Sequence, residues 1–464
     1  MGSAAGYAEA GERLTALTAT TGSKSSCDGL LVQPVAGDAS LPKAVDVVVV
    51  GAGIVGASAT WFLARRGLKV ALCEKGVVGG EQSGRNWGWC RNTLRHPSEI
   101  PLMQQAMRDW RDPAVFGGLD TGFRTSGILY FTGRNRDDES TYRNWLDSVA
   151  EYRLDSRMVT AAEAARLVPG GTQSVGGLYT ASDGGAEPER ATGVIAEAAR
   201  AAGATIHTTC AVRTIETEAG RVSGVVTERG PIRCRAVLLA AGIWSRLFAG
   251  NLGIDLPQLK VMGSVMRTHP LPGEPDVSVA GRRFGWRKRD DGGYIVSQAD
   301  ATVFDIVPDS FRLLRDFRPA LASGLRSLRL RVGRRFIEEA RLARRWTADA
   351  ATPFEQVRIA DPQPASWVLK QAAAKVAEAY PVFAGMQIAG CWGGLIDVMP
   401  DALPVIGPIA AIPGLYMATG FSGHGFGIGP GAGRLTAELV CGEKPCVDPT
   451  AFRLERFART RSFV

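Results

Sequence analysis

The chain has 464 residues, which is too long for one small core and favours two or three domains. Hydrophobic residues make up 45% and charged residues 22%, an ordinary globular composition. The net charge of +8 would attract anions weakly, but no nucleic-acid-binding motif accompanies it, so the sequence argues against a nucleic-acid partner.

The sequence shows no targeting or membrane-spanning signal. No apolar run approaches the roughly 18 residues of a membrane span, so no transmembrane segment is expected. Residues 1–42 are rich in Ala, Gly, Ser and Thr and lack the features of a signal peptide, so we interpret them as a loose leader. The eight cysteines form no CxxC pair, which fits a reduced compartment without a metal site. We therefore expect a cytoplasmic protein, with peripheral attachment to a membrane as the alternative.

The first ordered segments, from about Lys43, have the pattern of a strand–helix–strand unit. The β-branched run from Val45 to Val50 is typical of a strand buried on both faces. Ile54 to Arg66 then has helical spacing, and Val70 to Glu74 is typical of a second buried strand. These segments predict one βαβ unit.

Later segments are expected to return to the same sheet. The apolar runs Arg235–Ala241 and Leu415–Ala418 predict strands, and a helical stretch, Ile428–Val440, follows the second run. Between them, alternating runs such as Gly127–Thr132 and Tyr294–Ser297 predict a separate mixed or antiparallel sheet.

The predicted fold class is α/β, with a Rossmann-type nucleotide-binding domain interleaved with an α+β substrate domain. The nucleotide-binding domain is predicted at residues 43–94, 186–254 and 396–464. The substrate domain is predicted at residues 95–185 and 255–395.

Much of the positive charge lies between Arg312 and Arg345, where the sequence has eleven arginines. Apolar residues recur through this stretch at roughly helical spacing. We interpret it as a helical face in contact with water; the alternative is a patch that binds a membrane or a partner.

The run Gly51-Ala52-Gly53-Ile54-Val55-Gly56 follows the first predicted strand and opens the first predicted helix. In this context glycines permit a tight turn and let backbone N–H groups approach a pyrophosphate. A carboxylate at Glu74 can accept hydrogen bonds from ribose hydroxyls and would repel the 2′-phosphate of NADP. We predict a dinucleotide site with contacts at Gly51, Gly53, Ile54, Val55, Gly56, Glu74 and Lys75.

Two further segments favour FAD over NAD as the cofactor. The loop at residues 79–91, GGEQSGRNWGWCR, offers donors for phosphate and flavin oxygens. The glycine-rich turn at residues 418–431 precedes a helix, whose positive N-terminus could stabilise negative charge on reduced flavin. The loop is predicted to contact FAD through Gln82, Ser83, Arg85, Asn86, Trp87 and Gly88.

Taken in order, these motifs resemble those of the glutathione-reductase-type flavoproteins. The motifs are GAGIVG with Glu74, AAG at 240–242, PDALPVIGP at 400–408 and ATGFSGHGFGIGPGAG at 418–433. Over about residues 44–440 the chain is similar to the D-amino acid oxidase, glycine oxidase and sarcosine oxidase superfamily, and its EQSGRNWGWCR stretch looks most like bacterial L-amino acid oxidases and D-amino acid dehydrogenases. The resemblance implies non-covalent FAD and further contacts at Val212, Ala241, Gly242, Trp244, Gly423, His424, Gly425, Gly427 and Ile428.

The resemblance also implies oxidation of the C–N bond of an amino acid, with hydride transfer to flavin N5 and no certain catalytic side chain. Many D-amino acid-oxidising members carry an arginine five residues before the Asp of the PDxLP motif, where this chain has Ile396. We favour Arg91 as the replacement anchor for a substrate carboxylate; the alternative is that it binds backbone or FAD phosphate. An anchor on the other side of the flavin fits L substrates. The other substrate-binding candidates are Trp392, Trp89 and Asp397, with core packing as the alternative for Trp392.

The sequence leaves three functions open. The first is an L-amino acid oxidase that forms a 2-oxo acid, ammonia and hydrogen peroxide, with oxygen or another electron acceptor. The second is a dehydrogenase or oxidase of D-amino or N-substituted amino acids, of the opine or sarcosine type, which would pass electrons to a quinone and dock on a membrane through Arg312–Arg345. The third is a flavin-binding subunit without turnover. The side-chain preference and the choice between a monomer and a homo-oligomer also stay open.

Overall fold

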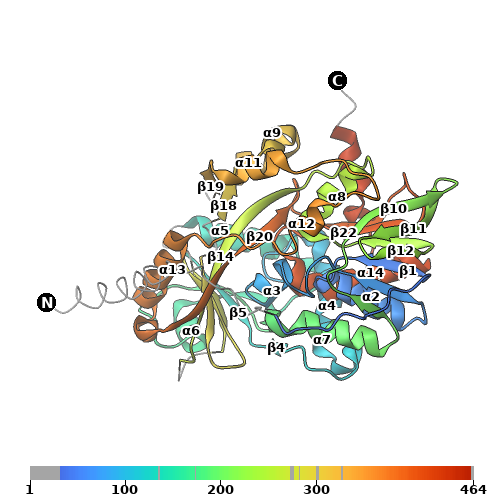
Figure 1. The fold of residues 1–464 in the computed structure, drawn as a ribbon. Coiled ribbons are helices and arrows are strands. Elements are labelled where there is room, and N and C mark those ends of the chain that lie inside the picture. The colour runs from blue at the N-terminus through green and yellow to red at the C-terminus, as the bar shows by residue number, and fades with distance from the viewer. Residues whose placement is uncertain are drawn as a thin grey trace.

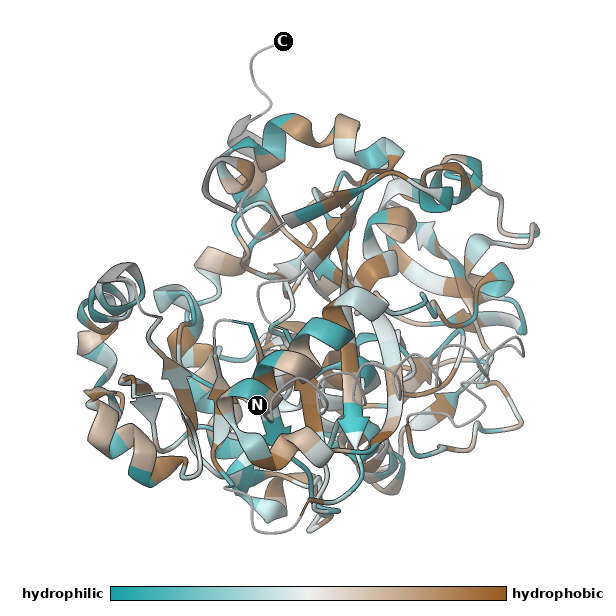
Figure 2. Ribbon diagram, turned by 90° about the vertical axis from the view of Figure 1, so that its left-hand side faces the viewer, coloured by the Kyte–Doolittle hydropathy of each residue, from teal (hydrophilic) through white to brown (hydrophobic). Residues whose placement is uncertain are grey.

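The computed structural model describes residues 32–460, apart from residues 134–135, 173, 272–275, 282, 299–301 and 325–327. Two large sheets organise this part of the chain. In Figure 1 one sheet, with β1 and β22, lies on the right, and the other, with β5 and β14, lies on the left. Strands at the centre are largely hydrophobic, whereas hydrophilic residues concentrate in the peripheral helices and loops (Figure 2). The predicted combination of a Rossmann-type domain and a second sheet is confirmed.

The nucleotide-binding sheet has six strands in the order β21-β22-β13-β1-β2-β9. Neighbouring strands are parallel except for β21 and β22, which are antiparallel. The βαβ unit and both later strands predicted from the sequence are part of it. Its strands are β1 (Val47–Val50), β2 (Val70–Cys73), β9 (Thr205–His207), β13 (Ala236–Leu239), β21 (Val405–Pro408) and β22 (Leu415–Thr419).

Alternate valines of β1 enter two different cores, because successive side chains of a strand point to opposite faces. Val47 and Val49 pack into the helical layer, while Val48 and Val50 pack into the layer that contains a three-stranded sheet. Both faces of β1 are therefore covered, as its unbroken apolar sequence predicts. The helical layer has α2 (Ile54–Ala64), α4 (Ile100–Arg111), α7 (Pro188–Ala201) and α14 (Gly425–Cys441); the other layer has β10 (Val212–Glu218), β11 (Arg221–Thr227), β12 (Gly230–Arg233), α8 (Ser245–Asn251) and α12 (Pro353–Gln356).

The second sheet is mixed. Its strands follow the order β19-β18-β14-β17-β16-β15-β5-β7-β6, and β20 also pairs with β14. The pairs β15–β5 and β18–β19 are parallel and the others are antiparallel. Its strands are β5 (Ile128–Phe131), β6 (Ser156–Val159), β7 (Gly177–Thr180), β14 (Leu259–Thr268), β15 (Ser278–Ala280), β16 (Gly285–Lys288), β17 (Tyr294–Ser297), β18 (Thr302–Asp305), β19 (Leu328–Arg331) and β20 (Ile388–Val398).

Helices and a small sheet surround these layers. Helix α13 (Ser366–Ala379) packs its apolar side on the mixed sheet. A three-stranded sheet, in the order β3-β8-β4, contains the end of the loop at residues 79–91. The remaining elements are α3 (Gln82–Arg85), β3 (Trp89–Cys90), β4 (Arg124–Thr125), α5 (Arg136–Ser148), α6 (Ala161–Leu167), β8 (Gly184–Gly185), α9 (Pro308–Arg312), α10 (Leu314–Gly324) and α11 (Arg334–Arg341).

Two helices lie in the ranges predicted for the substrate domain but pack on the nucleotide-binding domain. Leu102 and Met103 of α4 belong to the helical core next to β1. Phe354 of α12 belongs to the core on the other face of the same sheet. Both helices therefore belong to the cores of the nucleotide-binding domain, although the predicted ranges include them in the substrate domain.

The prediction of a loose leader is wrong for its described part. Residues 1–31 lie outside the described residues. Val32 is only 7% exposed, and the Gln33 N–H donates to Glu189 O at 2.6 Å. Asp38 exchanges two hydrogen bonds with Ile206, from Asp38 N to Ile206 O at 2.7 Å and from Ile206 N to Asp38 Oδ2 at 2.8 Å. Ordered packing begins upstream of Lys43 because this segment pairs with the edge strand β9 and with α7.

The arginine-rich stretch is not one continuous helical face. Strand β19 separates α10 from α11 and pairs with β18. Arg326 lies outside the described residues. Helical spacing did not reveal the strand because its pairing partner is distant in sequence.

Candidate active site

A cavity of about 520 Å³ lies where the two large sheets meet. The nucleotide-binding domain contributes the carboxyl ends of β1, β2, β13 and β22, and the mixed sheet contributes residues of β14, β17 and β20. Ligands of open α/β sheets bind at the carboxyl ends of the strands, so this cavity is the candidate active site.

The first glycine motif forms a turn that excludes side chains. Gly51 has φ +101°, and a Cβ on it would lie 2.6 Å from Ala240 O. A Cβ on Gly56 would lie 1.9 Å from Gly51 O. The backbone of this turn therefore lies close to both the neighbouring strand and the cavity. Helix α2 begins directly after Gly53, and its N-cap residue provides no capping side chain. Such a helix N-terminus offers N–H groups and a positive dipole end to a pyrophosphate.

Glu74 directly follows β2, and the sequence predicts it as a carboxylate that binds ribose. Its Oε2 accepts from Ala52 N and its Oε1 accepts from Gly76 N, each at 2.8 Å. Burial raises the pKa of Glu74, and Lys75 opposes that shift. Each carboxylate oxygen retains a second acceptor site, so the group can also accept from ribose hydroxyls.

Lys75 and Ser83 line the cavity with their polar groups already engaged. The Lys75 ammonium donates to Glu81 Oε1 at 2.8 Å and to the carbonyls of Val357 and Arg358. Ser83 Oγ accepts from Ile54 N at 2.9 Å. Both side chains therefore bind protein groups at the edge of the cavity and fix the segments that line it.

The side chains of Arg85 and Asn86, which the sequence predicts as donors to flavin or phosphate, form hydrogen bonds within the loop and to neighbouring segments. Arg85 Nε donates to Gly80 O at 3.1 Å, and its Nη1 donates to Gly393 O at 3.1 Å and pairs with Asp361. Asn86 Oδ1 accepts from Gly88 N at 2.7 Å. Both residues line the cavity, and their hydrogen bonds fix the loop that forms its wall.

The second helix N-terminus at the cavity belongs to α14. Gly423, His424, Gly425 and Gly427 line the cavity, and the helix has no side-chain cap. Because α14 has 17 residues, its N-terminus has a developed dipole that favours negative charge. This is the position that the sequence predicts for stabilising reduced flavin.

A buried cluster of charges holds this helix end. The Arg95 guanidinium is 2% exposed, donates from Nη2 to His424 O at 3.0 Å and lies 3.4 Å from Glu99 Oε1. Glu99 Oε2 lies 3.6 Å from His424 Nδ1. Burial would raise the pKa of Glu99, but Arg95 and His424 together lower it to about 2. Burial lowers the pKa of His424 to about 4, although Glu99 opposes this shift.

Arg91 lines the cavity beside an aromatic wall. Its guanidinium carbon lies 5.8 Å from the centroid of Tyr130, and Nη1 donates to Thr93 O. Trp89 meets Tyr130 edge-on at 5.9 Å and Trp87 at 4.8 Å, measured between ring centroids. All four side chains line the cavity, which places one guanidinium among aromatic rings.

The loop that carries Arg91 is fixed by a fully buried carboxylate. Asp183 Oδ1 accepts from Asn92 N at 2.7 Å, and Asp183 Oδ2 accepts from Thr93 Oγ1 at 2.6 Å. Arg95 Nε donates to Arg91 O at 3.1 Å. These hydrogen bonds fix the backbone segment that carries Arg91.

Asp397 and Ile396 line the cavity, whereas Trp392 does not. The Trp392 side chain packs with Val265, Ile295 and Trp87, and its indole N–H donates to Arg85 O at 2.9 Å. This tryptophan, predicted to border the pocket, lies behind the wall. Asp397 Oδ2 accepts from Gln258 Nε2 at 3.1 Å and Gly420 N at 3.0 Å, and burial raises the pKa of Asp397 to about 6.

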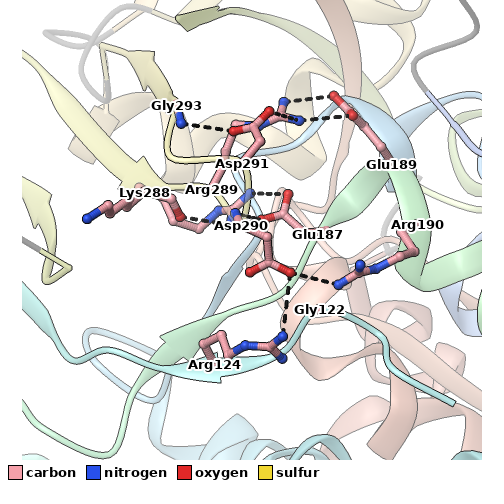
Figure 3. Close-up of polar contacts among 12 residues, drawn as sticks. Gly122, Arg124, Glu187, Glu189, Arg190, Lys288, Arg289, Asp290, Asp291 and Gly293 are labelled. Carbon is pink, nitrogen blue, oxygen red and sulfur yellow. Dashed lines mark hydrogen bonds and ion pairs between the residues drawn. The ribbon is translucent and has the colours of Figure 1, made fainter. Parts of the chain in front are cut away.

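An ion-pair network joins α7 to the turn between β16 and β17 (Figure 3). Arg289 forms two hydrogen bonds to Glu189, at 3.0 and 3.2 Å, and Arg190 Nη2 donates to Asp290 Oδ2 at 2.8 Å. Glu187 accepts from Asp290 N at 3.0 Å. The network ties the mixed sheet to the nucleotide-binding domain next to the cavity wall.

Of the predicted cofactor contacts, all but Gly56, Gly88 and Ile428 line the cavity. Gly56 and Gly88 lie at close backbone approaches, and Ile428 is fully buried in the helical core. Sequence reasoning missed Tyr130 and the Arg95–Glu99 pair, which belong to no motif. Their only signals were an aromatic residue in a predicted strand and an i,i+4 charge pair after the loop.

The lining matches the chemistry of FAD along its whole length: a carboxylate for ribose, one helix end for the pyrophosphate and a second for the flavin. The model of the family described as FAD dependent oxidoreductase (DAO) matches residues 46–439. Glycine oxidase of Pseudomonas aeruginosa is 28% identical, covering 88% of this chain and 97% of the relative. Sarcosine oxidase subunit beta of Rhodobacter capsulatus is 24% identical, covering 89% of each chain.

Among solved structures, L-amino acid deaminase from Proteus myxofaciens in complex with anthranilate superposes with a TM-score of 0.88. It is 34% identical, and the match covers 92% of this chain and 96% of the other. This chain belongs to the FAD dependent oxidoreductase (DAO) family, and it is an enzyme whose cofactor is FAD.

Proposed function

We propose that this enzyme oxidises the Cα–N bond of an L-amino acid. The substrate loses its Cα hydrogen as hydride and a proton from nitrogen, and water hydrolyses the resulting imino acid to a 2-oxo acid and ammonia. FAD, when bound, supplies the two-electron acceptor for this step. Oxygen or another acceptor then receives the electrons.

The observation that carries the proposal is the position of Arg91. Its guanidinium lies on the aromatic wall of the cavity, and a planar guanidinium binds a carboxylate with two parallel hydrogen bonds. At the position where many D-amino acid-oxidising relatives carry an arginine, this chain has Ile396, which also lines the cavity. An anchor on Arg91 in place of residue 396 would present the other face of Cα to the flavin, which supports L substrates.

The comparisons support the same proposal. The Proteus protein, 34% identical to this chain, is an L-amino acid deaminase. Its complex contains anthranilate, an aromatic ring with a carboxylate and an amine. A guanidinium bordered by Trp89 and Tyr130 suits a ligand with these groups.

The protein's part in this reaction is orientation and desolvation. Arg91 would hold the carboxylate, the aromatic wall would exclude water, and the N-terminus of α14 would favour negative charge on the reduced cofactor. We assign no side chain as a general base, since His424 contacts Glu99 and Asp397 is engaged by Gln258 and Gly420.

The test is an anaerobic titration of the purified holoenzyme with matched L- and D-amino acids, followed by the flavin absorbance. We expect bleaching by L enantiomers only; admitting air then distinguishes an oxidase, which recovers colour and forms hydrogen peroxide, from a dehydrogenase. Bleaching by D enantiomers alone would contradict the assignment of chirality. A flavin that no amino acid or amine bleaches would favour a subunit without turnover.

A second candidate substrate class follows from the curated relatives. These include a glycine oxidase and a sarcosine oxidase subunit, so an achiral or N-substituted amino acid is the alternative. Glycine and sarcosine belong in the same titration, and faster bleaching by either than by any chiral L-amino acid would favour this class.

A further inference from the structure

The charged groups around Arg95 are sorted by depth from the cavity. The side chains of Arg91 and Arg95 line the cavity, whereas those of Glu99 and Asp183 do not. Glu99 and Asp183 are only 1% and 0% exposed, so both carboxylates lie inside the protein, behind the two guanidinium groups. Asp397 also lines the cavity, but it belongs to β20. Around Arg95, the positive groups therefore face the cavity and the negative groups lie behind them.

Arg95 is fixed beside the first turn of α14. Its Nε donates to Arg91 O at 3.1 Å, its Nη2 donates to His424 O at 3.0 Å, and its Nη1 lies 3.4 Å from Glu99 Oε1. A Cβ on Gly427 would lie 3.5 Å from Arg95 Nη2, so the guanidinium lies against the helix itself. A fixed unit charge thus adds to a helix end whose dipole is already positive.

Glu99 opposes this charge from the far side of Arg95. Burial acts against ionisation of Glu99, but Arg95 and His424 lower its pKa to about 2, so the carboxylate is charged at neutral pH. Burial lowers the pKa of His424 to about 4, so its ring is neutral there. Arg95 and Glu99 therefore form a buried dipole with its positive end toward the cavity. In a protein interior such charges interact more strongly than in water, so both contribute to the field in the cavity, with opposite signs.

We propose that Arg95 and Glu99 set the electron affinity of the bound flavin, which Arg95 raises and Glu99 restrains. Reduction adds negative charge to the flavin, so a fixed cation nearby favours the reduced form and a fixed anion disfavours it. The inference depends on the flavin lying at the start of α14, and it is independent of which amine is the substrate. Neither side chain has to touch the substrate, because both act on the cofactor through their charge.

The experiment measures two properties of the flavin in the holoenzyme, its two-electron reduction potential against a reference dye and its dissociation constant for sulfite. Sulfite adds to flavin N5 and leaves negative charge on the ring, so its affinity reports the same field without any amino acid. Arg95→Met should weaken sulfite binding by about tenfold, because it removes the nearby cation. A tenfold change in a two-electron equilibrium corresponds to a potential lower by about 30 mV. Glu99→Gln should strengthen sulfite binding and raise the potential.

Two further variants separate charge from packing. Arg95→Lys keeps the cation and should shift both readouts far less than Arg95→Met does. The matched control is Asp109→Asn, because Asp109 of α4 is 2% exposed and accepts from Arg434 of α14 at 2.6 and 3.0 Å, yet neither residue lines the cavity. This control should leave both readouts unchanged.

FAD content and unfolding temperature show whether each variant is folded. If Arg95→Met does not retain FAD, the opposite shift expected for Glu99→Gln and the retained values expected for Arg95→Lys still decide the proposal. The proposal is overturned if Glu99→Gln weakens sulfite binding or lowers the potential, if Arg95→Lys shifts both readouts as far as Arg95→Met does, or if no variant differs from Asp109→Asn. Neither readout involves an amino acid, so such a failure would leave the proposed substrate untouched.

Discussion

Arg287 and Glu187 form an ion pair that is almost completely removed from water, with exposed fractions of 5% and 9%. The pair is bidentate, at 2.9 and 3.1 Å, and Arg287 Nε also donates to Trp87 O at 2.6 Å. One guanidinium therefore joins β16 of the mixed sheet, the start of α7 and the loop that forms the cavity wall. A Cβ on Gly88 would lie 2.6 Å from Arg287 Nε, which explains the glycine beside Trp87.

We predict that Arg287→Met destabilises the protein by about 3–5 kcal/mol, because Glu187 would stay buried without its partner. Thermal unfolding of the holoenzyme measures this loss. The double variant Arg287→Met/Glu187→Met is the control, since removing both charges should recover part of the loss. Equal unfolding temperatures for the single and double variants would show that the unpaired carboxylate is not the cause.

Glu74→Gln tests the nucleotide site. An amide has one acceptor oxygen, so the backbone N–H of either Ala52 or Gly76 loses its acceptor, and the ribose loses a charged one. Hydrogen bonds to charged groups contribute about 1.5–3 kcal/mol, which corresponds to roughly a ten- to hundredfold weaker FAD affinity. Reconstitution of apoprotein with FAD measures this affinity. Unchanged affinity would remove Glu74 from the FAD site.

The nucleotide half of the cavity was predictable because each of its parts has a local signature. The unbroken run of valines in β1 predicts a strand buried on both faces. The turn that follows requires Gly51, because it leaves no room for a Cβ there. The spacing of apolar residues predicts that the last long helix starts near residue 428, whereas α14 begins at Gly425. Glycines have low helix propensity and no side chain, so the apolar spacing does not reveal the first turn.

The substrate half was less predictable because long-range packing forms it. Tyr130 faces the cavity through the pairing of β5 with β7 and β15. Trp392 lies behind the cavity wall because its indole packs against Trp87. In the arginine-rich stretch, the pairing of Val303 with Arg329 converts a helical pattern into a strand.

Arg91→Met should lower kcat/KM for amino acids by about ten- to hundredfold, through the lost charge-assisted hydrogen bonds to the carboxylate. Arg91→Lys should recover only part, since an ammonium lacks the planar fork. The corresponding amino acid amide, which lacks the carboxylate charge, is the internal reference. Its kcat/KM should change much less, and an equal loss for acid and amide would mean that Arg91 does not recognise the carboxylate.

His424 should make the stability of the protein depend on pH. Burial lowers its folded-state pKa to about 4, from an ordinary value of 6.5. Between these two values the unfolded chain binds a proton at His424 and the folded protein does not, so stability is complete above about pH 6.5 and falls as the pH drops toward 4. The slope from one such group is at most about 1.4 kcal/mol per pH unit.

His424→Asn removes this titration, so its unfolding temperature should fall less than that of the parent protein between pH 6.5 and 4.5. Asp397, whose pKa is raised to about 6, acts in the opposite direction, but it is present in both proteins and cancels in the difference. Glu99 has a pKa near 2 and contributes only below its ordinary value of 4.5. The comparison is therefore made from pH 6.5 to 4.5. Parallel profiles for the two proteins over that window would show that His424 is not held neutral beside Glu99.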